Sequence, residues 1–195
     1  FTVHASSGDC SIEKETETSV KVLGNLWVTN TEHDVVQCFR SNGSFVMQAL
    51  GSTYLSAPYS ILGLDEDRIL VGNHRMKRSL VEVFDKSGAH QYAFEIEEQD
   101  GSAIFGEFGA DTIMLHPTTG EIWVGGPQGY LVAYSDDGTF LRKLDMGEAT
   151  LLPRFLLPLP DGTAVLVPES VTTTWDLHLL DTDASLIGSF GIAAM

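Results

Sequence analysis

The chain has 195 residues, a mass of 21.2 kDa and 43% hydrophobic residues, which is enough to bury a sizeable core and excludes general disorder. Charged residues make up only 19%, which argues against a coiled coil. The 11 Lys and Arg against 27 Asp and Glu give a formal net charge of −16, which repels nucleic-acid phosphates and anionic lipids. We therefore expect neither nucleic acid nor a membrane surface as a partner.

The start of the chain precedes the first repeat. The first residue is Phe1 rather than Met, as expected of a processed product or a piece of a longer protein. Residues 1–17 are expected to form an extra N-terminal strand that helps to close a ring, or to be the remnant of an earlier repeat. No apolar run is long enough to cross a membrane as a helix. An extracellular or periplasmic location is slightly favoured.

Two cysteines, Cys10 and Cys38, allow two states. They do not form a C-x-x-C pair, and two thiols are too few for a zinc site of their own. Cys38 falls within an apolar run, which favours a buried free thiol. In an oxidising compartment the two residues would be able to form one disulfide instead.

Four copies of one pattern run through the chain, each an apolar run, a tight turn and a second apolar run. The apolar column of their alignment holds Phe39, Phe84, Tyr134 and Leu180, at separations of 45, 50 and 46 residues. The turn column holds Gly43, Gly88, Gly138 and Ala184. Glycine there permits the positive φ that a type I turn with a bulge requires, so each copy predicts a β-hairpin.

Each hairpin is preceded by two further short runs rich in Val, Ile, Leu and aromatic residues, so each copy predicts four antiparallel strands. A unit of about 45 residues cannot bury both of its faces alone, whereas stacking the units around an axis buries them. We therefore predict an all-β fold, a single β-propeller domain over residues 1–195. Its four blades are expected at about residues 18–52, 53–110, 111–150 and 151–195.

Several segments resemble the NHL-repeat family of β-propellers, whose pattern is roughly an opening proline, G-N-I-Y-V, an N-H-R loop and I-x-V-F-D-x-x-G-x-F. The similar segments are GNLWV at 24–28, APYSI at 57–61, GNHR at 72–75 and VEVFDKSG at 81–88. The resemblance covers about residues 18–195. It implies a fold that recognises ligands or proteins through loops at two rims around a channel.

The sequence also departs from that family. Its propellers usually have more blades than the four counted here, and the fourth copy has Ala184 and Leu180 in place of the glycine and the aromatic residue. The chain is therefore expected to be a compact four-bladed ring, part of a larger ring, or a partial ring that a second copy completes. An open ring would expose two blade faces. Residues 95–110 form an insertion between blades and are a candidate functional loop.

Histidines on one rim are the candidate metal ligands. His33 and His74 are expected in corresponding loops of adjacent blades, and Glu169 of the fourth blade is expected on the same rim. Some related propellers, such as the amidating lyases, hold zinc with channel histidines, so the resemblance implies a zinc site as an alternative to solvated loop histidines. His116 is expected on the opposite rim and is not part of this set.

Acidic pairs occur in the turns at 65–67, 136–137 and 181–183. They lack the ligand spacing of an EF-hand, and Asp in turns is explained by hydrogen bonds to the neighbouring backbone. Calcium is expected at most as an adventitious ion or as an ion on the axis of the ring. Our default expectation is that the protein carries no cofactor.

Further candidate binding residues lie in the same predicted loops. Residues 76–79 look inserted relative to the family, and the lengthened loop groups His74 with Arg75, Lys77 and Arg78, to which we add Arg68. Such a basic cluster on an acidic chain is a counter-charge or a docking point for an acidic partner. Two more candidates are Gln128 on the same rim and Trp175 just before a strand of the fourth blade.

Two other features favour structural roles. Trp27 and Trp123 occupy equivalent positions, which indicates packing between blades. Asn42 begins an Asn-Gly-Ser glycosylation pattern that is also the expected composition of a tight turn.

The preferred function is a non-enzymatic binding or scaffold module for a protein or a small ligand, with no catalytic residue assigned. One alternative is a metal-dependent lyase or hydrolase of propeller type with a site in the channel. Another is a partial propeller that completes its ring by oligomerisation.

Overall fold

The computed structural model describes residues 25–49, 53–75, 78–96, 110–126, 131–144, 146, 153–168 and 175–192. Within these ranges all regular structure is β-strand except for one 3₁₀ turn, η1 (Thr31–His33), so the all-β prediction is confirmed. None of the described residues belong to a helix that is long and apolar enough to cross a membrane.

The strands form four antiparallel sheets, one for each predicted repeat. Blade 1 contains three described strands, β1 (Leu26–Asn30), β2 (Val35–Phe39) and β3 (Phe45–Ala49). Blade 2 contains β4 (Pro58–Gly63), β5 (Arg68–Arg75), β6 (Arg78–Asp85) and β7 (His90–Glu95). Blade 3 contains β8 (Thr112–Leu115), β9 (Ile122–Gly125), β10 (Leu131–Tyr134) and β11 (Phe140–Leu144). Blade 4 contains β12 (Pro153–Pro158), β13 (Ala164–Pro168), β14 (Trp175–Leu180) and β15 (Leu186–Ile192).

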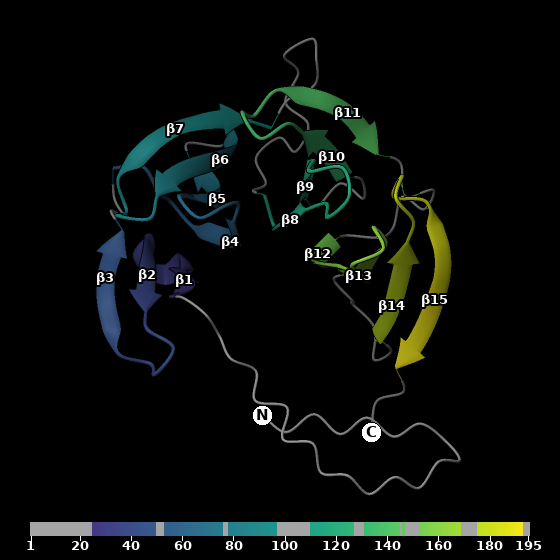
Figure 1. Cartoon of the computed structure of the whole chain (residues 1–195), viewed down its shortest axis with the longest axis horizontal. Helices are drawn as coiled ribbons and strands as arrows, with labels where there is room; N and C mark the ends of the chain where they lie inside the picture. The colour runs from purple at the N-terminus through teal and green to yellow at the C-terminus, as the bar shows by residue number, and fades with distance from the viewer. Residues whose placement is uncertain are drawn as a thin grey trace, which may run out of the picture.

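The four sheets stand side by side along an arc, with blade 1 and blade 4 at its two ends (Figure 1). The strands β1, β4, β8 and β12 contact one another in series along the inside of the arc. Residues 1–24, which include the expected first strand of blade 1 and the expected N-terminal strand, lie outside the described residues.

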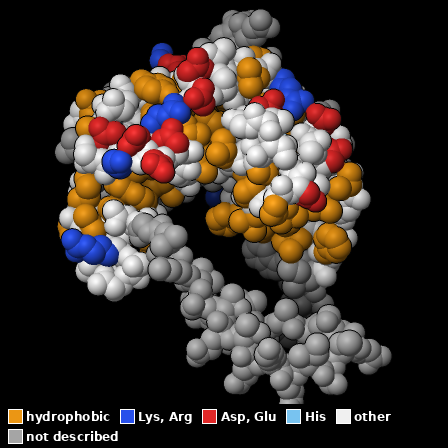
Figure 2. Space-filling view, viewed as in Figure 1, with side chains coloured by type: hydrophobic (Ala, Val, Ile, Leu, Met, Phe, Trp, Pro, Cys, Tyr) orange, Lys and Arg blue, Asp and Glu red, His pale blue; other side chains and the backbone are white. Residues whose placement is uncertain are grey.

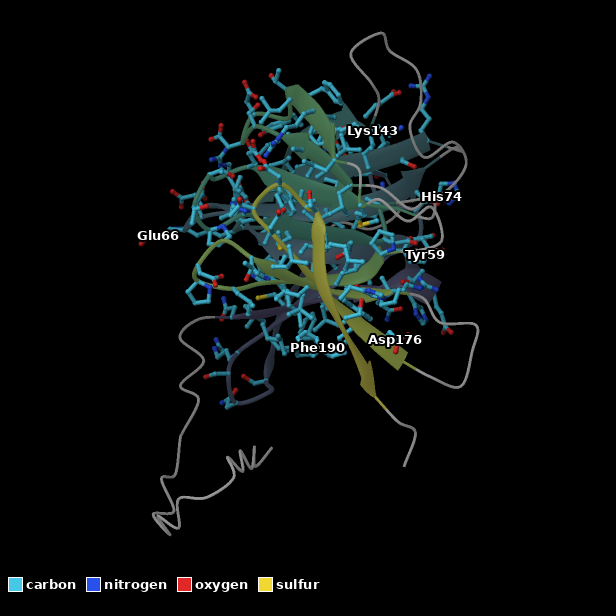
Figure 3. All side chains as sticks on the ribbon, turned by 90° about the vertical axis from the view of Figure 1, so that its right-hand side faces the viewer. Tyr59, Glu66, His74, Lys143, Asp176 and Phe190 are labelled. Atoms are coloured by element: carbon cyan, nitrogen blue, oxygen red, sulfur yellow. The ribbon has the colours of Figure 1, made fainter. Side chains whose placement is uncertain are left out.

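Alternating strand directions divide the connections between two rims. In each blade, the turn between the first two strands and the turn between the last two strands lie on one side of the molecule, which we call the turn rim. The connections between the two middle strands and between blades lie on the other side, the connection rim. Figure 3 shows Glu66 on the turn rim, and His74 and Tyr59 on the opposite side, on the connection rim.

The predicted hairpins are confirmed in every blade. The register of the last two strands shifts just before each residue of the apolar column, which marks a bulge at Phe39, Phe84, Tyr134 and Leu180. Gly43, Gly88 and Gly138 have φ values of 80°, 82° and 85°, in the left-handed region that favours glycine. Ala184 adopts the same conformation at φ 64°, so blade 4 makes the same turn without glycine.

The described residues form three apolar core layers, one at each junction between neighbouring blades. The layer between blades 2 and 3 includes Leu70 and Val83 of one blade and Ile122 and Val124 of the next. Trp123 is fully buried between blades 3 and 4, and Trp27 is half-buried between blades 1 and 2. Blade packing was the predicted role of both tryptophans, and it is confirmed.

Two local predictions are wrong. Residues 72–75 and 78–79 belong to strands rather than to a lengthened loop, because β5 and β6 continue pairing as far as His74 with Ser79 and Arg75 with Arg78. The backbone hydrogen bonds of this extended ladder replace the predicted loop. In addition, β14 begins at Trp175 itself and pairs it with Ile192, so Trp175 does not precede the strand.

Candidate functional site

On the connection rim, blade 1 is joined to blade 2 by hydrogen bonds between their connecting segments. The 3₁₀ turn η1 of blade 1 stands beside the segment that enters blade 2, and two hydrogen bonds join them. Thr31 Oγ1 donates to the carbonyl oxygen of Pro58 at 2.7 Å, and Asp34 Oδ1 accepts from the backbone N–H of Ala57 at 2.6 Å. These bonds fix the two connections against each other.

Both residues of the second bond are held in the left-handed region. Asp34 has φ 55° and Ala57 has φ 51°, two of the three such non-glycine residues in the described part of the chain. Alanine pays about 1–2 kcal/mol for this conformation, and a residue before proline normally prefers extended backbone. Strain of this kind persists only where surrounding contacts impose it, and it is concentrated at functional sites.

The fixed turn presents polar side chains to solvent. Thr31, Glu32 and His33 are all exposed. The imidazole Nδ1 of the exposed His33 forms a hydrogen bond of 3.0 Å with Oδ1 of Asn30, which restrains the orientation of the ring. We name Asn30, Thr31, Glu32 and His33 the η1 surface.

A buried polar network supports this rim from below. Asn73 is fully buried, and its Oδ1 accepts from the backbone N–H of Ser56 at 2.8 Å. Its Nδ2 donates to the carbonyl oxygen of Tyr54 at 2.7 Å and to Glu82 Oε1 at 3.2 Å. Glu82 in turn pairs its Oε2 with His90 Nε2 at 2.8 Å.

The network is packed between aromatic rings. The ring of His90 stacks on that of Tyr54 with centroids 3.9 Å apart and an angle of 7° between the planes. Its edge meets Phe84 at 5.3 Å. The side chain of Glu82 is only 1% exposed, so it is a buried carboxylate whose partners are all supplied by the protein. The network therefore holds the rim rigid and does not itself offer a binding group to solvent.

Sequence reasoning missed Asp34, Tyr54, Asn73, Glu82 and His90. Comparison of polar positions across the repeats contains a usable signal for two of them. Glu82 stands where the other blades have Gln37, Val132 and His178, and His90 stands where they have Phe45, Phe140 and Leu186. Blade 2 thus has an acidic residue at one of these aligned positions and a histidine at the other, and such a combination in a single blade indicates that the two side chains form a pair.

The predicted metal ligands are placed only in part. His33 lies in η1, between the two middle strands of blade 1, and is therefore on the connection rim. His74 is on the same rim, although it lies in β5 rather than in a loop (Figure 3). Glu169 lies outside the described residues. Among the residues that are described, no three His, Cys, Asp or Glu side chains gather in a way that would hold a metal ion.

His74 and His116 are the two histidines of the described residues whose Nε2 atom is buried without a hydrogen-bond partner, and of these His74 lies on the connection rim. Its backbone N–H donates to the carbonyl oxygen of Ser56 at 3.2 Å, which ties it to the segment that enters blade 2. Its Nε2 atom is buried and has no hydrogen-bond partner in the described ranges. An imidazole nitrogen in this state is a candidate ligand or proton acceptor.

Arg68 is separate from the other residues of the predicted basic cluster. Arg68 and Arg75 are at opposite ends of β5, about 23 Å apart at 3.3 Å per residue, so Arg68 lies on the turn rim. Arg78 forms an ion pair with Glu95 across the outer strands. Lys77 and Gln128 lie outside the described residues, as do the side chains of Arg75 and Trp175 and most of the 95–110 insertion.

On the turn rim, Arg68 joins two blades. It contacts Asp65 Oδ2 at 2.7 Å within its own blade and Asp136 Oδ2 at 3.1 Å in blade 3. Asp65 Oδ1 accepts from the backbone N–H groups of Asp67 and Arg68. The hydrogen bond from the Asp67 backbone and that from the Arg68 guanidinium hold the pKa of the Asp65 carboxyl below its usual range.

The other acidic turns behave as their composition predicts. Asp137 Oδ1 accepts from Thr139 N–H at 3.0 Å, and Asp181 Oδ1 accepts from Asp183 and Ser185 N–H at 2.9 and 2.8 Å. Asn42 Oδ1 likewise accepts from Ser44 N–H at 3.0 Å. These side chains close their own turns.

A second ion-pair group on the turn rim joins blades 3 and 4. Arg142 contacts Glu121 Oε2 at 3.0 Å and Asp183 Oδ1 at 3.0 Å, and Trp123 Nε1 donates to Glu121 Oε2 at 3.1 Å. Burial alone would raise the pKa of Glu121, but the hydrogen bonds from Trp123 and Arg142 outweigh it and hold that pKa below its usual range. His116 lies here, on the rim predicted for it, fully buried against the Trp123 ring at 4.7 Å.

The Glu121 pKa predicts part of the acid sensitivity. Because its folded pKa is lowered, its contribution to stability is present above the unfolded pKa of about 4.3 and is lost as pH falls through the folded value. We expect Glu121→Gln to lower the urea midpoint at about pH 7 and to reduce the further loss on going to about pH 3. The matched control is Glu66→Gln, an exposed carboxylate on the same rim. Parallel pH curves for wild type and Glu121→Gln would contradict this assignment.

Cys38 is a buried free thiol, 0% exposed. Burial raises its pKa, against a smaller opposing effect of Arg40, which keeps the sulfur protonated and unreactive. Cys10, its potential disulfide partner, lies outside the described residues.

Comparisons with known proteins identify the fold. No protein-family model and no curated protein matches the chain. A streptogramin B lyase structure aligns over 88% of this chain and 51% of its own, at 12% identity and a TM-score of 0.61. A catalytically inactive virginiamycin B lyase from Staphylococcus aureus with quinupristin aligns over 90% and 54%, at 13% identity and a TM-score of 0.60. A protein of unknown function from Bacteroides caccae aligns over 88% and 58%, at 12% identity and a TM-score of 0.58.

The chain is a β-propeller. The agreement extends over about nine-tenths of the chain, and the four antiparallel blades match those of the neighbouring structures. At these identities the likeness concerns the fold alone. The propeller described here spans about half the length of the chains that it matches.

Proposed function

We propose that this propeller is an NHL-like binding module and that the η1 surface is part of its binding face. The observation that carries the proposal is the bond between Asp34 and Ala57, which holds two left-handed residues and fixes η1 to blade 2. A turn whose conformation is set before a ligand arrives loses little entropy on binding. Propellers vary such rim loops while the blades stay constant, so recognition is expected there.

The charge of the surface selects the ligand class. Glu32 is exposed on η1, the chain carries a net charge of −16, and the oxygen of Asn30 is already used by His33. We therefore favour a protein or small ligand with basic groups, held by Glu32 and by the imidazole of His33. Nucleic acid is disfavoured by the same charge, so the protein is expected to pass through a heparin column at moderate salt.

Binding to a lysine-rich peptide tests this proposal, with an aspartate-rich peptide of equal length as the comparison probe. Glu32→Ala and His33→Ala are each expected to weaken the lysine-rich complex by about threefold or more in calorimetry. Glu66→Ala is the matched control, because Glu66 is also an exposed carboxylate and lies on the opposite rim. Equal losses for Glu32→Ala and Glu66→Ala would show general charge attraction and overturn the proposal, as would no binding at all.

The second candidate is an enzyme of the propeller lyase type. Two observations favour it, the fold shared with structures of streptogramin B and virginiamycin B lyases and the unpartnered Nε2 of His74 on the connection rim. Quinupristin is the probe, because it is the molecule in one of those structures. Its consumption, followed by mass spectrometry with added zinc or calcium and again after chelation, would support this candidate. Consumption that His74→Ala leaves unchanged would count against a role for that residue.

A further inference from the structure

The outer face of blade 4 is apolar across all four of its strands. We call it the blade 4 end face. Three of its side chains are strongly exposed, Phe155 at 63%, Leu157 at 54% and Phe190 at 59%. The pairing register places four half-buried side chains on the same face, namely Val165, Val167, Leu177 and Leu179. Figure 2 shows hydrophobic side chains gathered at this end of the molecule.

In the inner blades the same positions are buried by the next blade. The pair Val165 and Leu179 of blade 4 corresponds in register to Leu70 and Val83 of blade 2. The corresponding residues of blade 3 are Trp123 and Ala133. These four residues of blades 2 and 3 are at most 1% exposed and pack against the following blade. Blade 4 is therefore built to receive a further blade.

The opposite end of the arc is complementary. On the outer face of blade 1, which we call the blade 1 end face, Leu26 is 54% exposed, Val28 39% and Phe45 53%. Leu26 and Val28 correspond to Ile122 and Val124 of blade 3, which fit against the Leu70 and Val83 face of blade 2. The blade 1 end face therefore has the apolar residues that, in blade 3, pack against the face of blade 2 that corresponds to the blade 4 end face.

The width of the blade 4 end face restricts which structures are able to cover it. Four strands at about 4.8 Å spacing span about 14 Å, and a single added strand pairs with a sheet edge rather than covering a face. A whole blade is required. Propellers typically close at four to eight blades, and two copies of this four-bladed arc make eight. Two copies also make up the length of the structures that the chain half-covers.

We propose that two copies of this chain close one ring head to tail, with the blade 4 end face of each on the blade 1 end face of the other. The arrangement has two-fold symmetry and leaves no end face open. Each of the two contacts between the copies has the same packing of blade on blade that joins neighbouring blades within one chain. The proposal is independent of the binding proposal, because the η1 surface lies on a rim and not on an end face.

Sedimentation equilibrium of the full chain tests the assembly. The expected mass is twice 21.2 kDa for the wild type. Leu157→Glu on blade 4 and Leu26→Lys on blade 1 are each expected to halve the mass, because each removes both contacts of the ring. The matched control is Leu141→Glu, a leucine that is 46% exposed on β11 of an inner blade and belongs to neither end face. It is expected to stay dimeric.

A mixing experiment fixes the orientation. In a mixture of Leu157→Glu and Leu26→Lys, one contact is unmodified and the other faces Glu with Lys, so a mixed dimer is expected to form. If Leu26→Lys leaves the dimer intact, blade 4 faces pair with each other and the head-to-tail ring is wrong. A wild type that remains at 21.2 kDa at high concentration would overturn the proposal entirely. Near-identical circular dichroism of the variants checks that each one folds.

Discussion

Replacing Gly72 with alanine is expected to destabilise the propeller by about 3 kcal/mol, through the junction between blades 2 and 3. A Cβ at Gly72 would lie 2.2 Å from Ser60 Oγ, 2.4 Å from the carbonyl oxygen of Ala110 and 2.9 Å from Ala110 Cβ. Ser60 Oγ donates to that same carbonyl at 2.7 Å, so the small space is already used by an interblade hydrogen bond. Ser60 can rotate, but the backbone of Ala110 cannot yield without moving blade 3.

The matched control is Gly63→Ala. Gly63 lies in β4 of the same blade, and a Cβ there would meet nothing within 4 Å. We expect a change of about 0.5 kcal/mol or less, because alanine in a strand costs less backbone entropy than glycine. The measurement is the urea midpoint of both variants at an unchanged m-value. Equal shifts for the two variants would show that close approach of the blades at Gly72 does not limit stability.

The blade pattern could be predicted from the sequence because its signals are local and repeated. In every copy a bulge is followed, at a fixed spacing, by a turn residue in the left-handed region. Gly43 and Gly138, for example, adopt the same left-handed conformation in their own hairpins. Even Ala184, a departure in the sequence, makes the same turn. Each repeat alone is a weak signal, but four repeats that align without a gap are enough to predict the fold class.

The end of the β5–β6 hairpin could not be predicted in the same way. The resemblance of the GNHR segment at 72–75 to a family motif predicts a loop, whereas its residues pair with β6. Strand ends depend on tertiary support. Here Asn73 forms hydrogen bonds with Tyr54 and Ser56 of the neighbouring connection, which are 19 and 17 positions away in the sequence.

The candidate site was found only in part. His33 and His74 were assigned to one rim from the strand order, which follows from local pattern. The left-handed conformation of Asp34 and Ala57 accompanies a hydrogen bond between residues 23 positions apart, and alanine is not a residue type that favours this conformation. Arg68 does not belong to the predicted basic cluster, because β5 is an extended strand that places Arg68 and Arg75 at its opposite ends.

The second large effect is expected at the buried pair in blade 2. His90→Phe would leave the Glu82 carboxylate buried with only Asn73 as a side-chain partner, which is expected to cost about 3–5 kcal/mol. The ring itself should fit. His90 meets Phe84 edge-on at 5.3 Å and 74°, and Phe45 and Phe140 meet their own partners in the same way at 75° and 81°. The loss is therefore electrostatic rather than steric.

The double variant Glu82→Val/His90→Phe separates these causes, because it copies Val132 and Phe140 of blade 3. With no carboxylate left to bury, we expect it to recover most of the stability that His90→Phe loses, in urea unfolding at neutral pH. Asn73 still donates to the Tyr54 carbonyl in this variant. If both variants lose the same amount, the stacking of His90 on Tyr54 stabilises blade 2 and the contact between Glu82 and His90 does not. Recovery would instead mean that blade 2 keeps an acid and a base where an apolar pair suffices for folding, so that their role is to fix Asn73 and the rim above it.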